Sequence, residues 1–302
     1  MIKIKMPEGP EVKVMTDNIR YLLTQSTGEM QLDSLKVIKE NFEKRTVDLN
    51  LLQLPQKVKH VKSKGKFTYI LLDDGAAIGI TYGMTGNIRT DESKHNAVEF
   101  ISKDVTFYYN STRHFGQVTF LSAEALAKKL DSLGYDILDA EPLSREVLVS
   151  TWRKKNSLNI CRLLLEEQKL VCGIGNYIKS EILYRAGVDP FCDVSKLTDD
   201  KLYELYLNAR EIGEAAYIDG GASLYTYTGL SGDKSPFKLK LSVYDREMDP
   251  EGYPIMRVAT PDKRSTFWVP EKQKIGSVLA EPVLKVIIKP KLLDSAKKSP
   301  VN

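Results

Sequence analysis

Two carboxylates and two prolines stand close together near the start of the chain, at residues 6–11, Met-Pro-Glu-Gly-Pro-Glu. If Met6 is the effective start and is removed, Pro7 begins the protein with a free secondary amine. Such an amine has an unperturbed pKa of about 8, so much of it can be neutral and nucleophilic near pH 7. The segment is also consistent with a stiff entry into a helix, whose dipole favours nearby carboxylates such as Glu8.

The chemistry of this segment depends on where translation starts. A free Pro7 nitrogen could attack a sugar carbon and form an iminium ion, and Glu8 could move the proton that ring opening requires. If residues 1–5 stay on the chain, the Pro7 nitrogen belongs to an ordinary amide and is not a nucleophile. Catalysis by Pro7 therefore requires Met6 as the start.

A lysine-rich turn occupies residues 62–66, Lys-Ser-Lys-Gly-Lys. Most such runs are solvated charge at the entry to a strand. Gly65 would let the backbone bend here, so that Lys64 and Lys66 could face the phosphates of a nucleic acid.

Residues 81–86 and 112–116 combine glycines with Met84, Arg113 and Phe115. Methionine and phenylalanine are ordinarily core residues, and that interpretation stays open here. At loop tips beside Arg113, the two apolar side chains would instead be wedges that fill the gap left by an extruded base.

Gly-Ile-Gly-Asn at residues 173–176 lies between two helical patterns. One interpretation is a plain helix–turn–helix in which Asn176 caps the second helix. The other is a phosphate clamp, in which Gly173 and Gly175 allow close approach, helix-terminal N–H groups point outward and Asn176 donates.

The elements that must position these residues change character along the chain. Val12, Met15, Ile19 and Leu22 have helical spacing, which predicts a helix from residue 9. Alternation with a period of two then runs through residues 67–120, with Phe67, Tyr69 and Leu71 on one face. These patterns predict an N-terminal β-sandwich domain over residues 6–135.

Helical periods dominate the second half, after a hinge linker predicted at residues 136–149. Leu202, Leu205, Ala209 and Ile212 form an amphipathic stripe with Thr198 as N-cap, within a helical domain predicted at residues 150–238.

The last part of the chain is strand-like and then loose. Leu239–Tyr244 and Ser265–Val269 are expected to pair as a hairpin within residues 239–275, and residues 276–302 are expected to be a tail.

The composition fits a soluble, intracellular, globular protein of two domains. The chain has 302 residues, of which 42% are hydrophobic and 28% charged, and its formal net charge is +4. These values exclude wholesale disorder, and no apolar run reaches the roughly 18–20 residues that span a bilayer. Three cysteines and three scattered histidines exclude a disulfide framework and show no spacing of a structural zinc site. The mildly basic balance suits nucleic acid without requiring it.

Taken together and in this order, the segments resemble the Fpg/Nei family of DNA glycosylase/AP lyases, from Met6 to about Lys274. The start of the chain is more similar to Nei-like members. The resemblance implies an α+β fold of two domains, an N-terminal β-sandwich with an N-terminal helix and a C-terminal helix–two-turn–helix domain, with DNA in the cleft between. It implies base excision repair of double-stranded DNA that carries oxidised bases or abasic sites, by an intracellular monomer in the nucleus or the cytoplasm, depending on the organism. No membrane, metal or dissociable cofactor is implied.

The resemblance also assigns roles to individual residues. Pro7 matches the nucleophile, Glu8 the catalytic acid and Lys66 a lysine that binds phosphate near the lesion. Met84, Arg113 and Phe115 match the residues that fill the void left by the extruded base. The DNA-binding residues matched in this way are Arg113, Arg162, Asn176 and Arg264.

The C-terminal hairpin departs from the family pattern. The family's zinc finger carries four cysteines, yet Val269 and Lys272 stand where the last pair would be, and the first pair is missing around residues 248–252. The sequence therefore resembles a zincless finger, which strand pairing and the apolar Val243, Phe267 and Trp268 are expected to hold.

Lesion choice and catalysis each leave an alternative. Thr81 and His114 differ from the residues that many Fpg enzymes carry, and the Gly220–Phe237 segment resembles an Fpg lesion loop behind a Nei-like start. Oxidised purines and pyrimidines thus both remain possible substrates. With residues 1–5 retained, the alternative is a non-catalytic protein that binds damaged DNA. A helix–two-turn–helix binder unrelated to repair would leave the Pro-Glu start unexplained.

Overall fold

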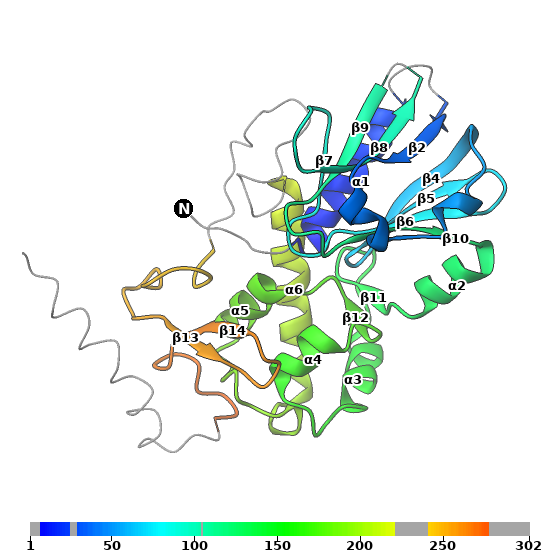
Figure 1. Ribbon diagram of the computed structural model, residues 1–302. Coiled ribbons are helices and arrows are strands. Elements are labelled where there is room, and N and C mark those ends of the chain that lie inside the picture. Colours follow the sequence, from blue (N-terminus) through cyan, green and yellow to red (C-terminus); the bar gives the residue numbers. More distant parts are fainter. Residues whose placement is uncertain (1–6, 25–28, 104, 221–240, 278–302) are drawn as a thin grey trace, which may run out of the picture. The chain divides into compact units, whose positions relative to one another are not determined.

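The computed structural model describes residues 7–24, 29–103, 105–220 and 241–277 (Figure 1). Met6, most of the Gly220–Phe237 segment and nearly all of the expected tail lie outside the described residues. The chain divides into two compact units, and neither is continuous in sequence. The first comprises Met1–Leu143, Glu167–Gly175 and Ala209–Lys240, and the second comprises Ser144–Glu166, Asn176–Asn208 and Leu241–Asn302. Residues 167–175 thus join the first unit, although they fall within the helical domain expected at residues 150–238.

Two mainly antiparallel sheets make up most of the first unit. One has the strand order β1-β4-β5-β6-β10-β3, in which only the β10–β3 pair is parallel, and the other has the order β2-β8-β9-β7. The strands are β1 (Gln31–Leu32), β2 (Ser34–Val37), β3 (Thr46–Val47), β4 (Gln56–Lys64), β5 (Phe67–Leu72), β6 (Ala77–Thr81), β7 (Asn87–Arg89), β8 (Asn96–Ser102), β9 (Val105–Asn110) and β10 (Gln117–Leu121). Short 3₁₀ helices, η1 (Glu40–Arg45) and η2 (Leu49–Leu51), precede and follow β3.

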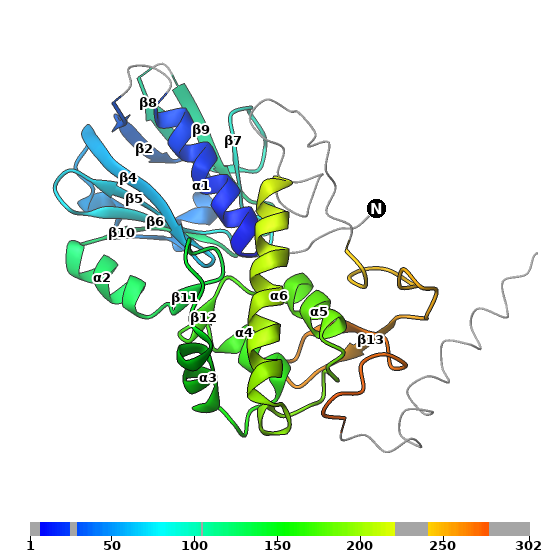
Figure 2. The ribbon, with the colours of Figure 1, turned by 180° about the vertical axis from the view of Figure 1, so that it is seen from behind.

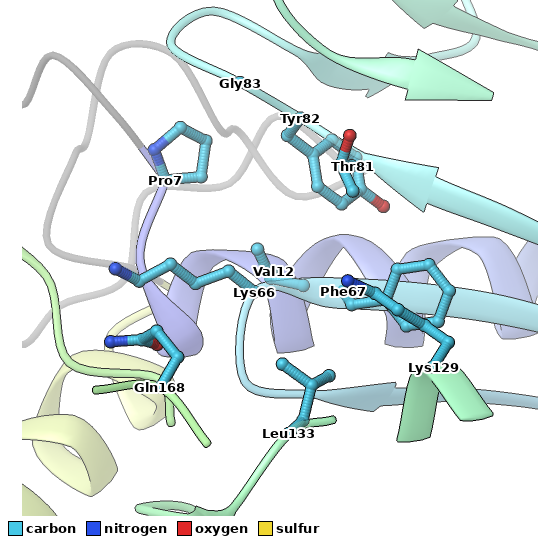
Figure 3. Close-up of a pocket in the computed structure, with 10 residues that line it drawn as sticks. All are labelled: Pro7, Val12, Lys66, Phe67, Thr81, Tyr82, Gly83, Lys129, Leu133 and Gln168. Atoms are coloured by element: carbon cyan, nitrogen blue, oxygen red, sulfur yellow. The ribbon is translucent and has the colours of Figure 1, made fainter. Parts of the chain in front are cut away.

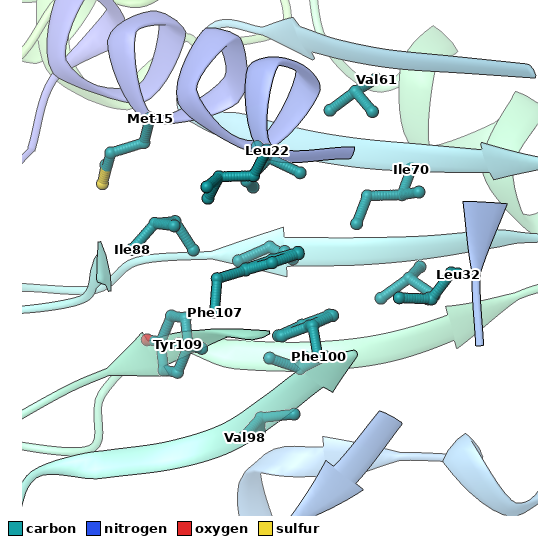
Figure 4. Close-up of a cluster of buried hydrophobic side chains, with 14 of the residues drawn as sticks. Met15, Leu22, Leu32, Val61, Ile70, Ile88, Val98, Phe100, Phe107 and Tyr109 are labelled. Atoms are coloured by element: carbon teal, nitrogen blue, oxygen red, sulfur yellow. The ribbon is translucent and has the colours of Figure 1, made fainter. Parts of the chain in front are cut away.

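The main apolar core joins both sheets to the helix α1 (Gly9–Thr24), as Figure 4 shows, and the ribbon of α1 can be followed beside the strands in Figure 2. The predicted stripe of α1 is confirmed, since Val12, Met15, Ile19 and Leu22 are all buried. Ile70 of the first sheet and Phe100 of the second lie in the same cluster. Burial of such side chains supplies the main favourable free energy of folding.

The strand β5 has apolar packing on both faces. Ile70 and Leu72 point into the main core, whereas Phe67, Tyr69 and Leu71 pack in a second cluster with Leu126 of the helix α2 (Ala123–Asp131). The predicted shared face of these three residues is therefore confirmed. This arrangement fixes the end of β5 next to residue 66, where a site residue is expected.

Two short parallel strands, β11 (Tyr135–Asp136) and β12 (Val171–Cys172), complete the part of the first unit that matters for the site. They bring a segment that follows α2 beside the glycine-rich segment 173–175, although the two are far apart in sequence.

Helices and one hairpin form the second unit. They are α3 (Arg145–Arg153), α4 (Ile160–Glu166), α5 (Asn176–Arg185), η3 (Val194–Lys196), the first part of α6 (Asp199–Ile218), and the strands β13 (Met256–Ala259) and β14 (Ser265–Trp268). Thr198 caps α6 as predicted, because its hydroxyl accepts the N–H of Lys201 at 3.2 Å. Among the described residues, no helix is both long and apolar enough to cross a membrane.

The predicted hairpin partner is wrong. Strand β14 pairs with β13, not with Leu239–Tyr244, and the register runs from Met256 opposite Trp268 to Ala259 opposite Ser265. In the described part of the expected strand, the buried Glu181 carboxylate accepts the N–H groups of Ser242, Val243 and Tyr244 at 2.8–2.9 Å. These donors serve a side chain and cannot serve a strand ladder.

Candidate active site

Pro7 and Glu8 stand immediately before α1, and both are buried. The Glu8 carbonyl accepts the N–H of Val12 at 3.0 Å, so Glu8 is the N-cap residue of the helix. Its own N–H donates to the carboxylate of Glu11 at 2.9 Å, as in a capping box. The first turn of α1 therefore fixes the backbone that carries the predicted nucleophile and acid.

The glycine-rich segment closes directly against these residues. The N–H of Gly9 donates to the carbonyl of Gly173 at 2.9 Å. A Cβ atom at Gly175 would lie 2.1 Å from the carboxyl carbon of Glu8, so any other residue there would force the Glu8 side chain to move. The predicted phosphate clamp needed glycine for close approach, but the group that fills the space at Gly175 is the Glu8 side chain.

The turn that carries Lys66 is tied to the same region. Gly65 has φ +57°, and a Cβ atom there would lie 2.9 Å from Cys172, next to Gly173. The N–H of Gly65 donates to the carboxylate of Asp136 at 2.5 Å. Burial raises the pKa of Asp136, and hydrogen bonds from the N–H groups of Gly65 and Leu138 oppose that rise.

Asp136 lies in the predicted hinge linker, where the sequence indicates no role for it. One signal could have identified it, because Asp136 is a carboxylate directly before Ile137 and Leu138 in a segment that is otherwise predicted to be a linker. In the structure it joins the Lys66 turn to the strand β11.

A cavity of about 290 Å³ opens within the first unit (Figure 3). Pro7, Lys66 and Gln168 lie at one end of it, and Figure 3 shows the Lys66 side chain extending toward the other two. The remaining lining residues are mostly apolar or aromatic: Val12, Phe67, Thr81, Tyr82, Gly83, Lys129 and Leu133. An apolar pocket with a few convergent polar groups is the usual form of a small ligand site.

Gln168 is a second residue that sequence reasoning left without a role. Its amide oxygen accepts the N–H of Gly173 at 3.2 Å, and its amide nitrogen donates to the carbonyl of Ile174 at 3.4 Å. Gln168 thus lines the cavity and also binds the glycine-rich segment through its side-chain amide.

The two loops with Met84, Arg113 and Phe115 pack against each other. A guanidinium nitrogen of Arg113 lies 3.7 Å from the Met84 sulfur, and the N–H of Arg113 donates to the hydroxyl of Thr85 at 3.1 Å. Phe115 is 52% exposed, so core packing does not account for it. The three side chains lie on adjacent loops, and Met84 is partly buried.

The other predicted DNA-binding residues belong to the second unit. Arg162 is an exposed residue of α4 and pairs with Glu166 at 2.9 Å. Arg264 is exposed at the end of the turn between β13 and β14. Asn176 begins α5, and its amide nitrogen donates to the carbonyl of Ser265 at 2.8 Å, so this donor is used to hold the hairpin.

The side chains of the hairpin segment do not fit a zinc ion. The segment after residue 192 has neither cysteine nor histidine. The carboxylate of Asp249, near the expected first pair of ligands, lies 2.9 Å from the ammonium group of Lys272, which stands where a ligand of the last pair would be. Among the described residues, no cluster of three or more His, Cys, Asp and Glu could hold a metal ion.

Comparisons with known proteins agree with this geometry. The formamidopyrimidine-DNA glycosylase N-terminal domain matches residues 6–118, and the formamidopyrimidine-DNA glycosylase H2TH domain matches residues 133–227. The formamidopyrimidine-DNA glycosylase of Variovorax paradoxus is 27% identical over 288 residues, which are 89% of this chain and 100% of that protein.

Solved structures give the same result. The crystal structure of MutM (Fpg) from Thermus thermophilus has a TM-score of 0.76 at 25% identity and covers 90% of this chain and 100% of that one. Lactococcus lactis Fpg, non-covalently bound to DNA with an AP site, has a TM-score of 0.71 at 22% identity, covers 88% of this chain and 99% of that one, and shows likeness of fold. The chain belongs to the Fpg/Nei family of DNA glycosylases.

Proposed function

We propose that this protein is a bifunctional DNA glycosylase/AP lyase that excises oxidised bases in base excision repair. The observation that carries the proposal is the packing of the buried Glu8 carboxyl group against Gly175, while Pro7, the residue before Glu8, lines a cavity. A nucleophile and an acid on adjacent residues are what attack on a nucleoside requires.

The proposed reaction begins with the free amine of Pro7. Its nitrogen attacks C1′ of the damaged deoxynucleoside, and the bond between C1′ and the base breaks with its electron pair going to the base. The proton that the Pro7 nitrogen loses neutralises the departing base. Glu8 donates a proton to the ring oxygen, so the sugar opens and an iminium ion joins Pro7 to C1′. This ion acidifies the neighbouring C2′ proton, and successive eliminations expel the 3′ and 5′ phosphates. Lys66 holds a phosphate near the lesion through its ammonium group.

Duplex DNA must release the base before this chemistry can occur. Flipping costs a few kcal/mol, and the cost is lowest at a damaged pair. Met84, Arg113 and Phe115 fill the vacated stack, which their adjacent loops and the exposure of Phe115 support. Arg162 and Arg264 contact the backbone, and Asn176 supports Arg264 by holding Ser265.

The partner in this proposal is double-stranded DNA with oxidised bases or abasic sites, and the protein acts on it as a monomer. Its proposed localisation is the compartment that contains the DNA, which is the nucleus or the cytoplasm, depending on the organism. Oxidised pyrimidines and oxidised purines are both proposed substrates.

A base-release assay tests the proposal directly. Protein that begins at Pro7 is incubated with duplexes that carry one oxidised pyrimidine, one oxidised purine or no damage, and the Glu8→Gln variant serves as the matched control. We expect base release from at least one damaged duplex and a rate lower by about 10²–10⁴ for Glu8→Gln, because the acid is lost while the shape is kept. Binding of damaged duplex without base release would favour the non-catalytic alternative.

A further inference from the structure

The base of the β13–β14 hairpin is held by a buried carboxylate. The Asp249 side chain is fully buried, and one of its oxygens lies 2.9 Å from the ammonium nitrogen of Lys272. The same oxygen accepts the hydroxyl of Tyr184 at 2.9 Å. The other oxygen accepts the N–H groups of Glu251 and Tyr253 at 2.9 and 2.8 Å. Asp249 therefore connects the helix α5, the turn before β13 and the segment after β14.

Lys272 has more than one partner in this cluster. Its ammonium nitrogen lies 2.6 Å from the carboxylate of Glu251 and 3.1 Å from the hydroxyl of Tyr184. It also lies 5.3 and 5.1 Å from the ring centroids of Tyr184 and Tyr253, within the range of cation–π attraction. Burial by itself would raise the pKa of Asp249. Hydrogen bonds from Lys272, the Tyr253 N–H and Tyr184 outweigh burial and lower this pKa from 3.8 to about 2.

A second ion pair lies near the tip of the hairpin. The ammonium nitrogen of Lys179, in α5, is 2.6 Å from the carboxylate of Asp262, and neither side chain is exposed. The other Asp262 oxygen accepts the hydroxyl of Thr260 and, at 3.4 Å, the N–H of Arg264. Asp262 stands two residues before Arg264, so its ion pair with Lys179 ties the turn that presents Arg264 to α5.

The physical reason for these pairs lies in the size of the hairpin. Its two strands have four residues each, and an isolated two-stranded hairpin is marginally stable at best. A buried ion pair adds little net stability, but loss of one partner leaves a buried charge and is strongly unfavourable. Two such pairs therefore determine the position of the hairpin on α5, and they contribute little to the free energy of unfolding.

We propose that the base clamp (Tyr184, Asp249, Glu251 and Lys272) and the tip clamp (Lys179 and Asp262) take the place of a bound metal and hold Arg264 in position to contact DNA. The proposal deepens the proposed function and rests on it for the role of Arg264. Lys272 is a positioning residue that acts through Arg264, since its ammonium group is occupied by Asp249 and Glu251.

DNA affinity tests the base clamp in the full chain. The variants are Lys272→Met, which keeps the length of the side chain without its charge, Lys272→Arg, Arg264→Ala and the Lys272→Met/Arg264→Ala double variant. Arg145→Met is the control, because it also removes one positive charge of the second unit from an exposed pair, with Asp200. The dissociation constant for a duplex with one abasic site is measured for each at matched salt.

We expect Lys272→Met and Arg264→Ala each to weaken binding by about 5- to 150-fold. The double variant should bind no more weakly than Arg264→Ala, because both changes remove the same contact. Lys272→Arg should restore most of the affinity, and Arg145→Met should change it by about twofold or less. Unchanged affinity of Lys272→Met, or additive losses in the double variant, would overturn the proposal.

Trypsin cleavage within the hairpin gives a readout that does not involve DNA. Lys272→Met should speed cleavage after Arg257, Lys263 and Arg264 more than it speeds cleavage elsewhere, since the hairpin loses its attachment. If Lys272→Met did not fold, Glu251→Gln would be used, because that side chain is 66% exposed. Equal cleavage in variant and wild type, or stoichiometric zinc by elemental analysis, would overturn the clamps. Failure of the wild type to bind abasic DNA would instead overturn the proposed function.

Discussion

The segment around Pro7 and the β13–β14 hairpin are both held in place by contacts with distant parts of the chain, but the contacts are of opposite kinds. In the first unit, Gly175 lies against the Glu8 carboxyl group and Gly9 lies against the backbone of Gly173, because Gly175 and Gly9 lack side chains. In the second unit, charged side chains reach inward and join the hairpin to α5 through Asp249 and Asp262. The Pro7 segment is therefore held by close packing at glycines, and the hairpin is held by buried ion pairs.

This difference predicts different sensitivities. The Pro7 segment should tolerate a change of surface charge but not one added carbon at Gly175, where the Glu8 carboxyl group fills the space. The hairpin should tolerate small changes of volume but not the loss of one charge, because the partner would stay buried and unpaired.

The largest effect is expected for Gly175→Ala. The added Cβ atom would lie 2.1 Å from the Glu8 carboxyl carbon, so the Glu8 carboxyl group must leave the position that it has in the structure. We expect base release to fall by about 10²–10⁴, as for loss of the acid itself, and the free energy of unfolding to fall by about 1–3 kcal/mol. Gly213→Ala is the control, because the atoms nearest to its added carbon are side-chain carbons of Ile137 and Leu138 at 3.1–3.6 Å. Wild-type rates of base release for Gly175→Ala would refute the close-contact account.

The next largest effect is expected for Arg264→Ala, which should distinguish DNA binding by the hairpin from catalysis by the Pro7 segment. We expect DNA binding to weaken by about 1–3 kcal/mol, because a charge-assisted contact is left unmade. The rate of strand cleavage at saturating protein should change much less, since Pro7 and Glu8 are untouched. The measurement is a comparison of the dissociation constant with the single-turnover rate, and an equal loss in both would contradict the division of roles.

The smallest effect is a change in the acid stability of the hairpin. The pKa of Asp249 is lowered from 3.8 to about 2, so its contribution to stability is present above pH 3.8 and is lost as the pH falls toward 2. Asp249→Asn should therefore be less stable than wild type at pH 7, and the difference should shrink between pH 4 and pH 2. Chemical unfolding at several pH values measures this, and a difference that stays constant would argue against a charged Asp249 in the folded protein.

The sequence predicts well whatever depends on local spacing. The stripe of Val12, Met15, Ile19 and Leu22 and the cap at Thr198 follow from helical periodicity and capping chemistry, and both are confirmed. The motif at residues 173–176 is also visible in the sequence, although the partner of its glycines is not. That Glu8 fills the space at Gly175 depends on a contact across 167 positions, which periodicity cannot indicate.

Long-range polar contacts account for what sequence reasoning missed. Glu181 occupies the N–H groups of residues 242–244, so the described residues 241–244 of the expected strand form no ladder, and β14 pairs with β13. Asp136 and Lys272 contact residues 71 and 23 positions away, whereas Gln168 contacts Gly173, which is five positions away in a turn that periodicity does not predict. Their residue types are common at surfaces, so residue type alone does not single them out.

The central claim is that the amine of Pro7 forms a covalent bond with the DNA sugar. Borohydride trapping on a duplex with one abasic site, read by intact mass, tests it most directly, with Pro7→Gly as the variant. We predict a covalent adduct whose protein mass begins at Pro7, together with slower cleavage of abasic DNA by Pro7→Gly. A protein that starts at Pro7 and binds the duplex without ever being trapped, or a Pro7→Gly variant that cleaves at an unchanged rate, would contradict the account.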